Sequence, residues 1–294
     1  MTEPLFDTIT IVGLGLIGSS VARGAKVRRL ARRVVGYDLS PQVHARAKEL
    51  GFCDQIANTS TEAAKNAELV LIAVPVGATA DAVKLVAPHL ADGAILTEVG
   101  SVKAAVIRQV LKVLPEGAIF VPGHPIAGTE HSGPDAGFAE LFEGRWCILT
   151  PCERSSTEAV EKVAKFWKGL GSAVETMTPE HHDIVLAITS HVPHLIAFNI
   201  VGTAADVEEV TNSEVIKFSA GGFRDFTRIA GSNPEMWRDI FLNNREAVLE
   251  MLQRFSEDLT ALQRAIRWGE GETLEKVFTE TRAVRKSVIE AKQA

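Results

Sequence analysis

Cysteine is scarce in this sequence, and two kinds of segment are missing. The 294 residues include three cysteines, Cys53, Cys147 and Cys152, which form no C-x-x-C pair and no even set. A disulfide framework is therefore not expected, and a reducing compartment such as the cytoplasm fits. No run of about 20 apolar residues occurs, so we expect no transmembrane helix. Residues 1–7 have neither a basic start nor a long apolar core, so no signal peptide is predicted.

Basic residues are fewer than acidic ones. The 31 Lys and Arg against 37 Asp and Glu give a net charge of −6, which argues against nucleic acid or an anionic membrane as a partner. An anionic substrate would then need a local cluster of cations. With 46% apolar and 23% charged residues, the composition is that of a soluble globular protein. The length allows one large domain or two ordinary ones.

The strongest local pattern is a glycine turn between a strand-like and a helix-like run. Residues 8–12 predict a strand and residues 16–29 a helix, with the spacing G-x-G-x-x-G at Gly13, Gly15 and Gly18. Gly13 allows a tight turn, and Gly15 lets the backbone approach a pyrophosphate. Gly18 lets the helix pack close to the strand, so the helix N-terminus faces the anion. The pattern predicts a dinucleotide site.

Asp38 indicates which dinucleotide is bound. It ends a second strand-like run and follows Gly18 by 20 residues, where a carboxylate can bind the ribose hydroxyls of an adenosine. A carboxylate there repels the 2′-phosphate of NADP, and residues 39–41 offer no arginine to hold that phosphate. NAD is therefore the predicted cofactor. Arginines that can approach from elsewhere are Arg32, Arg33 and Arg46.

The apolar runs divide the chain into two halves. The first alternates short apolar runs with helical patterns, which predicts an α/β fold with a parallel sheet covered on both faces. Later strands are expected at 69–75, 94–99, 118–121, 147–150 and 173–177, and helices at 102–114 and 157–170. Thr178-Pro179-Glu180 breaks the pattern. We expect a Rossmann-type dinucleotide-binding domain over residues 1–178 and an all-α dimerisation domain over residues 179–294.

The second half has a helical pattern throughout. Helices are expected at 181–203, 207–218, 234–266 and 272–292, with a turn at Gly269-Glu270-Gly271. In the third of these helices, apolar residues recur every three or four positions, as in a buried stripe: Leu249, Leu252, Phe255, Leu259 and Leu262. Several such stripes can be buried against a second copy of the chain. We therefore predict a homodimer formed through this half.

Three loops follow the carboxyl ends of predicted strands, where reactive groups gather in an open α/β sheet. The loop Pro75-Val76-Gly77 is expected beside the nicotinamide or its ribose, or is a simple tight turn. Ser101 is placed to cap the next helix, and a capping serine can also point its hydroxyl into a cleft. His124, between a glycine and a proline, has a ring suited to accept a proton near neutral pH.

The helical half contributes four histidines. Pro193 suggests the first turn of a helix, so His191 and His194 can share one face. A third metal ligand at a suitable spacing is not evident, so no metal site is predicted. The pair His181 and His182 is interpreted as a solvated helix start.

The middle of the helical half contains an arginine with a candidate role. Arg228 is suited to clamp an organic acid, because arginine binds carboxylates through two parallel hydrogen bonds. Asp225 lies three residues earlier and can meet Arg228 on one helix face, or the two form an ordinary surface ion pair.

Together these residues resemble the prephenate/arogenate (cyclohexadienyl) dehydrogenase family of tyrosine biosynthesis. The resemblance covers nearly the whole chain. Its motifs are GLGLIGSS at 13–20, GSVK at 100–103, HPIAGTE at 124–130, GPDAGFAELF at 133–142, TSHVPH at 189–194 and FRDFTRIA at 223–230. It implies an oxidative decarboxylation of prephenate or arogenate. Hydride leaves the ring carbon that bears the hydroxyl and goes to NAD⁺, the ring carboxylate leaves as CO₂, and the ring becomes aromatic.

The resemblance also implies roles for individual residues. The residue matching His124 accepts the proton of the substrate hydroxyl, the one matching Ser101 orients that histidine and the hydroxyl, and the one matching Arg228 holds a substrate carboxylate. Residues expected to line or gate the pocket are His194, Ser190, Glu130, Asp225, Trp237, Gly128 and Thr129. Residues expected to bind NAD are Gly13, Gly15, Leu16, Ile17, Gly18, Asp38, Val74, Pro75 and Ser101.

One departure from the family pattern stands beside the predicted site. The family often carries Asp-x-Gly-Ser where this chain has Glu98-Val99-Gly100-Ser101, and the extra methylene can shift a hydrogen bond near Ser101. No sequence is left for a chorismate mutase or regulatory domain, so any tyrosine inhibition is expected at the active site.

Two other functions stay open at this point. The first is a different NAD-dependent dehydrogenase with a Rossmann and a helical domain, such as a β-hydroxyacid dehydrogenase, a class that uses a lysine from the helical domain. The second is a non-catalytic NAD-binding sensor. A sensor would not need His124, Ser101 and Arg228 to be poised together.

Overall fold

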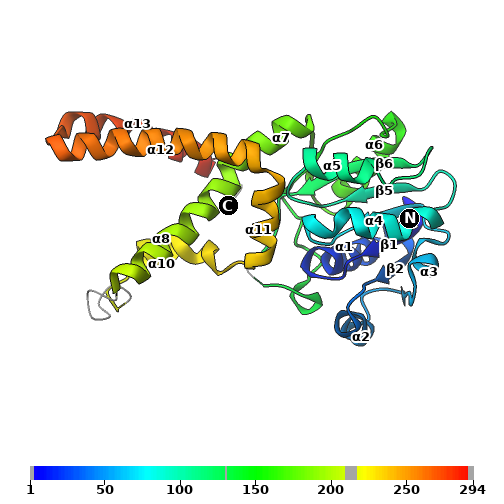
Figure 1. Ribbon diagram of the computed structural model, residues 1–294. Coiled ribbons are helices and arrows are strands. Elements are labelled where there is room, and N and C mark those ends of the chain that lie inside the picture. Colours follow the sequence, from blue (N-terminus) through cyan, green and yellow to red (C-terminus); the bar gives the residue numbers. More distant parts are fainter. Residues whose placement is uncertain (1–2, 130, 209–216, 291–294) are drawn as a thin grey trace.

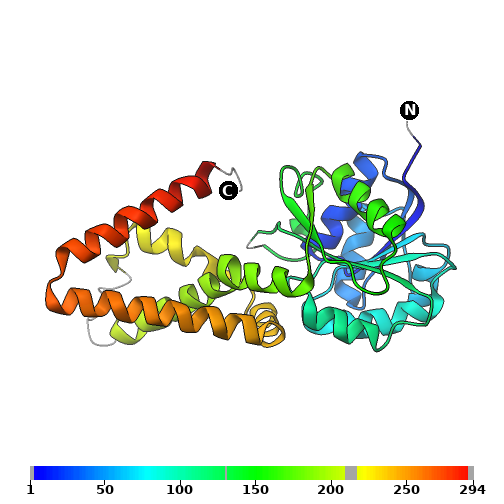
Figure 2. The same cartoon turned by 90° about the horizontal axis from the view of Figure 1, so that it is seen from above.

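The computed structural model describes residues 3–129, 131–208 and 217–290. The N-terminal half is built on an eight-stranded sheet, with strand order β3-β2-β1-β4-β5-β6-β7-β8. The C-terminal half is helical and extends away from one side of the sheet (Figures 1 and 2). The order of β3 to β6 is that of a dinucleotide-binding sheet, and it reverses direction between β1 and β4.

The strands lie close to the expected runs. They are β1 (Phe6–Val12), β2 (Ala31–Tyr37), β3 (Gln55–Ile56), β4 (Leu69–Ile72), β5 (Ile95–Glu98), β6 (Ile119–Pro125), β7 (Trp146–Leu149) and β8 (Ala173–Thr176). The two-residue β3 was not expected, because a strand this short carries no periodicity. Buried residues fill β4 and β5 completely, as is typical of parallel strands covered on both faces.

One strand pair departs from the expected parallel arrangement. β3, β2, β1, β4, β5 and β6 pair in parallel, but β6 and β7 are antiparallel. A parallel partner needs a crossover, usually through a helix. The described residues between β6 and β7 hold only the short 3₁₀ turn η3 (Pro134–Ala136), so β7 returns beside β6 in the opposite direction.

Helices cover both faces of the sheet. One face packs against α1 (Leu16–Val27) and α6 (Thr157–Gly169). The other packs against α4 (Thr79–Val86) and α5 (Ala104–Leu111). Smaller elements of this half are α2 (Pro41–Leu50), α3 (Ser60–Ala64), η1 (Val76–Ala78) and η2 (Ala87–His89). The second core also takes in Trp237 and Ile240 of α11 (Pro234–Asn243), so the helical half shares a core with the sheet half.

The helical half begins with one long, nearly continuous helix. It consists of α7 (Pro179–Leu186), the π-helical segment η4 (Ala187–His191) and α8 (Val192–Glu208). The expected helix start at Pro193 is therefore wrong. A proline inside a helix clashes with the preceding turn and lacks an N–H to donate. The wider π turn directly before Pro193 accommodates it. The helix expected at 207–218 lies mostly outside the described residues.

Within the described residues, four further helices and one short turn follow. They are α10 (Gly221–Thr227), η5 (Arg228–Gly231), α11, α12 (Arg245–Trp268) and α13 (Gly271–Glu290). The single helix expected at 234–266 is divided at Asn244, whose side chain is used in tertiary hydrogen bonds. α12 and α13 form the long hairpin drawn in orange and red in Figure 1, and Gly269, with φ 68°, makes the expected turn between them.

The apolar stripe on α12 is only partly buried within one chain. Leu249 and Leu259 are 57% and 53% exposed, whereas Leu252 is partly buried and packs against a small core that includes Val248 and Met251. The periodicity identified the helix correctly, and burial of the exposed residues against a second copy stays a prediction.

The first long helix is more apolar than expected. Residues Pro179–Val207 include an 18-residue stretch with mean hydropathy of at least 1.2, and by length and composition alone the helix could cross a membrane. Only 28% of that stretch is buried. Buried polar residues of the same helix, His182 and Asp183, hydrogen-bond to residues of the sheet half. These bonds make the helix part of the folded structure.

The glycine turn after β1 fits closely against its surroundings. Gly13 has φ +94°, and a Cβ there would lie 2.5 Å from the carbonyl oxygen of Ala73. A Cβ on Gly18 would lie 1.9 Å from the carbonyl oxygen of Gly13. The turn and the close helix–strand packing expected from the spacing are therefore confirmed.

Gly18→Ala is expected to destabilise the protein. The added methyl meets backbone rather than a flexible side chain, so α1 must move away from β1, at a cost of about 1–3 kcal/mol. Urea unfolding measures the change. The matched control is Gly202→Ala, another helical glycine with no atom within 4 Å of a Cβ. There alanine should stabilise by up to about 1 kcal/mol. Equal stability of the two variants would contradict the close packing at Gly18.

Candidate active site

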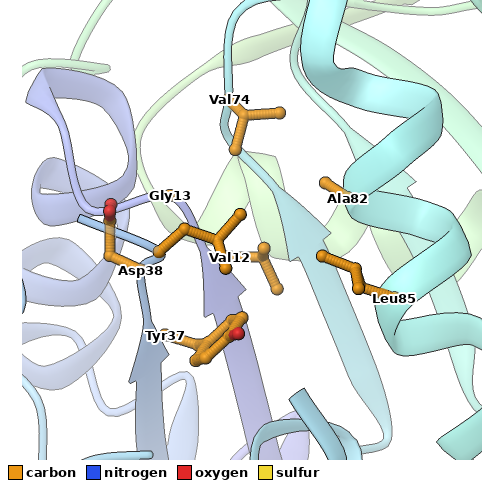
Figure 3. Close-up of a pocket in the computed structure, with 8 residues that line it drawn as sticks. Val12, Gly13, Tyr37, Asp38, Val74, Ala82 and Leu85 are labelled. Atoms are coloured by element: carbon orange, nitrogen blue, oxygen red, sulfur yellow. The ribbon is translucent and has the colours of Figure 1, made fainter. Parts of the chain in front are cut away.

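A pocket lies at the carboxyl ends of β1, β2 and β4, where the strand order reverses. Apolar side chains of Val12, Val74, Ala82 and Leu85 form its walls, and Asp38 stands at its rim beside Gly13 (Figure 3). Tyr37 and Leu39 complete the lining. Apolar walls with one carboxylate at the edge suit a flat base joined to a ribose.

Asp38 is held rigidly beside the glycine turn. Its Oδ2 accepts the N–H of Leu14 and its Oδ1 accepts the N–H of Ser40, both at 2.8 Å. Each carboxylate oxygen keeps a second lone pair, so ribose hydroxyls can still bind. In front of the turn, a Cβ on Gly15 would meet nothing within 4 Å. Leu16 and Ile17 follow in the first turn of α1, whose N-terminus favours an anion.

The arginines near Asp38 in sequence already have partners. Arg46 binds both carboxylate oxygens of Asp135 and also pairs with Glu49. Arg33 donates to Gln55, and Arg32 lies 3.5 Å from the carboxylate of Asp7. Together with the carboxylate of Asp38, these pairs fit NAD better than NADP.

His124 lies in β6, at the same carboxyl edge of the sheet as the pocket and two strands beyond β4. It is 8% exposed, and its Nδ1 lies 2.9 Å from Nε2 of His182. Its Nε2 makes no hydrogen bond within the described residues, so this nitrogen is the one left available to a ligand.

His182 and Asp183 come from the first turns of α7, in the other half of the chain. Nδ1 of His182 lies 2.9 Å from Oδ1 of Asp183. The Asp183 carboxylate also accepts the backbone N–H groups of Lys103 and Ala104 at 2.8 and 2.9 Å. These N–H groups open α5, so Asp183 satisfies the helix N-terminus across the boundary between the halves.

Two interpretations from the sequence need correction here. His182 is not solvated but fully buried, while His181 is exposed. Ser101 is not the cap of α5. That helix starts at Ala104, after the capping position at Lys103, and its free N–H groups are taken by Asp183. Within the described residues Ser101 is half-buried in the bend before Lys103 and has no hydrogen bond to His124.

A buried ion pair lies directly behind His124. The ammonium of Lys103 pairs with Glu98 and donates to the carbonyl of Gly123 at 2.7 Å. Glu98 also accepts the N–H of Gly100 at 2.7 Å. Burial raises the pKa of Glu98 and lowers the pKa of Lys103, and their mutual attraction opposes both shifts. Glu98, which is one methylene longer than the aspartate of the family pattern, therefore binds both Gly100 and Lys103 and fixes the loop between them.

Aromatic rings continue the site on the helical side. His194 stacks on Trp237 with ring centroids 3.7 Å apart, and His191 meets the same indole edge-on at 6.0 Å. The shared face expected for the two histidines is therefore confirmed. Nδ1 of His191 accepts from the side-chain amide of Asn244 at 3.0 Å, and that amide also donates to the Asp183 carbonyl. Nδ1 of His194 lies 2.8 Å from the Ser190 carbonyl oxygen.

The remaining predicted pocket residues are more dispersed. Arg228 opens η5, which packs against α8, and its charge contributes to lowering the pKa of His194. Asp225 pairs with Arg224 on an exposed surface, at 3.3 Å. Gly128 and Thr129 are exposed in the loop after β6. Val74 and Pro75 follow β4, before η1. Glu130 lies outside the described residues.

Burial keeps the site's histidines neutral. The pKa of His124 lies well below 6.5, first because burial disfavours the charged ring and then because of repulsion from His182, Lys103 and His191. Burial likewise lowers the pKa of His182, of His194 and, to about 4, of His191. At neutral pH His124 is therefore able to accept a proton.

Sequence comparison assigns both halves of the chain. The family described as "Prephenate dehydrogenase, nucleotide-binding domain" matches residues 21–176, and "Prephenate dehydrogenase, dimerization domain" matches residues 178–280. The chain belongs to the prephenate dehydrogenase family. The resemblance inferred from the motifs is thus confirmed, and so is the fold class.

Individual relatives agree with the family. The chain is 42% identical to a cyclohexadienyl dehydrogenase of Zymomonas mobilis over 281 residues, 96% of either chain. The structure is similar to that of prephenate dehydrogenase from A. aeolicus in complex with hydroxyphenyl propionate and NAD⁺, with TM-score 0.89, 33% identity and coverage of 96% and 98%. It is also similar to a Synechocystis arogenate dehydrogenase, with TM-score 0.81, 27% identity and coverage of 96% and 99%.

The buried histidines predict that stability falls on acidification. Their folded pKa values lie below the unfolded value of about 6.5, so the unfolded chain binds more protons below that pH. Stability is complete above about pH 6.5 and is lost as the pH falls toward 4, the region of the His191 pKa.

The measurement is the free energy of unfolding in urea between pH 7.5 and 4. His191→Asn should reduce the slope in this window, because asparagine can still accept from Asn244 but does not titrate. His181→Asn, at an exposed position, should leave the slope unchanged. The same slope in wild type and His191→Asn would contradict the account.

Proposed function

We propose that this protein catalyses the NAD-dependent oxidative decarboxylation of prephenate, arogenate or both. The observation that carries the proposal is the neutral His124, held at the carboxyl end of β6 by a hydrogen bond at Nδ1, while its Nε2 makes no hydrogen bond within the described residues. It lies on the same sheet edge as the pocket at Asp38. Membership of the prephenate dehydrogenase family and the likeness to cyclohexadienyl and arogenate dehydrogenases support the substrate class.

NAD⁺, when bound, supplies the hydride acceptor. The residues proposed to hold it are Gly13, Gly15 and Gly18 at the turn, Leu16 and Ile17 at the helix N-terminus, and Asp38, Val74, Pro75 and Ser101 around it. Their fit is physical: the space in front of Gly15 is open, and the pocket walls beside Asp38 are apolar.

His124 is the proposed general base. Loss of hydride makes the carbinol carbon electron-poor, and a base must take the hydroxyl proton as the carbonyl forms. A neutral imidazole with a bare Nε2 can do so at pH 7. The ring carboxylate then leaves as CO₂, driven by aromatisation, so the protein needs only to position the ring and hold the charged groups.

The substrate-holding groups come from the helical half. Arg228 is proposed to bind a substrate carboxylate, with His194, Trp237 and Ser190 lining the pocket beside it. Asp225, Gly128, Thr129 and Glu130 are proposed to close its outer side. Ser101 is proposed to contact the substrate hydroxyl.

The chain is further proposed to act as a homodimer in the cytoplasm. The apolar faces of α8 and α12 are exposed in one chain, including Ile200, Leu249, Leu259 and Ile266, and a second copy would cover them. The description of residues 178–280 as a dimerization domain supports this. We place the domain boundary between 178 and 179, in the short connection between β8 and α7.

The direct test is NADH formation by purified protein with NAD⁺ and prephenate, and separately with NAD⁺ and arogenate. Turnover with at least one is expected, and the ratio of kcat/KM ranks the two substrates. His124→Asn should bind NAD⁺ normally but lose turnover, because only the base is removed. Wild-type protein that binds NAD⁺ yet turns over neither substrate would refute the proposal and leave a sensor or another dehydrogenase.

Asp38→Ala is expected to weaken NAD⁺ binding and to narrow the preference for NAD⁺ over NADP⁺. Two hydrogen bonds to ribose and the repulsion of a 2′-phosphate are lost together. The measurement is kcat/KM for both cofactors at a saturating concentration of the organic substrate. A variant that still strongly prefers NAD⁺ would place the discrimination elsewhere. Arg46→Ala is the control, because it removes the ion pair between Arg46 and Asp135 but leaves the carboxylate of Asp38 in place.

A further inference from the structure

We propose that His182 and Asp183 are positioning residues that fix which nitrogen of His124 carries its proton. The inference rests on the proposed function, in which His124 is the base. It starts from one geometric fact: three side chains from two halves of the fold form a single hydrogen-bonded line, Asp183–His182–His124, with two links of 2.9 Å.

The proton positions follow from the Asp183 end. Asp183 accepts two backbone N–H groups at the start of α5, a setting that favours a carboxylate. A carboxylate only accepts, so Nδ1 of His182 must donate to it. A neutral His182 then has a bare Nε2, which can only accept. Nδ1 of His124 must therefore carry a proton and donate it to that Nε2.

The consequence lies at the other nitrogen. With its proton on Nδ1, neutral His124 has a bare Nε2, the nitrogen that does not face His182. The opposite tautomer would place two bare nitrogens against each other at 2.9 Å and leave Nε2 unable to accept a proton. The hydrogen-bonded line thus makes Nε2 the basic atom, as a third group orients the base in nucleophile–base pairs.

The surroundings keep the line in this state. The backbone N–H groups of Lys103 and Ala104 donate to Asp183. The ammonium of Lys103 donates to the carbonyl of Gly123, next to His124. Asn244 holds Asp183 by its carbonyl oxygen. His182 is fully buried, so water does not compete for its ring.

The test compares His182→Met with His182→Gln. Methionine fills the space without an acceptor, so kcat for the organic substrate should fall about 10–100-fold, the effect typical of losing a partner behind a functional histidine. The Kd for NAD⁺ should stay unchanged. Glutamine can place an amide oxygen near the former Nε2 and should recover most of the loss. His181→Met, at the exposed neighbouring position, is the control and should keep wild-type kcat.

A purely structural role would give a different pattern. It would lower stability and NAD⁺ binding together, with no rescue specific to glutamine. If His182→Met keeps wild-type kcat, or glutamine and methionine behave alike, the proposal is wrong while NADH formation by the wild type still supports the function.

The wild type offers a test that depends on neither a variant's folding nor a substrate. In ¹⁵N NMR spectra of imidazole-labelled protein at pH 7, His124 should show a protonated Nδ1 and a bare Nε2, with its signals identified by their loss in His124→Asn. A protonated Nε2 would overturn the proposal. Absence of NADH formation with the expected tautomer would instead refute only the proposed function.

Discussion

The structure depends on one carboxylate at the boundary between its two halves. Asp183 lies in α7 of the C-terminal half, yet its carboxylate accepts hydrogen bonds from the first N–H groups of α5 in the N-terminal half. Buried N–H groups without partners are costly, so the two halves are most stable in one relative position. The same carboxylate orients His182, and His182 in turn orients His124. The interaction that joins the halves therefore also prepares the candidate base.

A second set of polar groups near His124, Lys103 and Glu98, also holds neighbouring elements in position. Lys103 and Glu98 are both buried, and their pair closes the loop that leads into α5. A buried ion pair contributes little net stability compared with apolar side chains, but breaking it is costly. Its value here is position: the ammonium also holds the Gly123 carbonyl beside His124. On the helical side of the site, Trp237 anchors α11 in the core of the sheet half, and its ring stacks on His194.

Much of the fold could be predicted because its signals are local. The fit of Gly18 against Gly13 and the hydrogen bond from Leu14 to Asp38, 24 positions apart, join segments that are near in sequence, and the structure places them as expected. The motifs also led to the correct family. His124 could be proposed from the sequence because the carboxyl ends of the strands face the site in this topology.

What could not be predicted depends on contacts between distant segments. His182 was interpreted as solvated because its sequence neighbours are polar. In the structure its ring is buried against His124, which is 58 positions earlier in the sequence. Ser101 matches a capping residue, but Asp183, 80 positions from Lys103, takes that role. Periodicity identified the apolar face of α12, but it could not show which of its residues pack within the chain and which stay exposed. The available signal for a buried polar site was the position of His182 and Asp183 directly before the apolar run 184–188.

The most direct test of the central claim is a high-resolution crystal structure with NAD⁺ and a hydroxyphenyl substrate analogue bound. The account predicts Nε2 of His124 within hydrogen-bond distance of the analogue's hydroxyl, while Nδ1 remains bonded to His182 and Asp183 still caps α5. A structure in which the hydroxyl is bound elsewhere, or in which His124 turns away from His182 when the ligands bind, would contradict it.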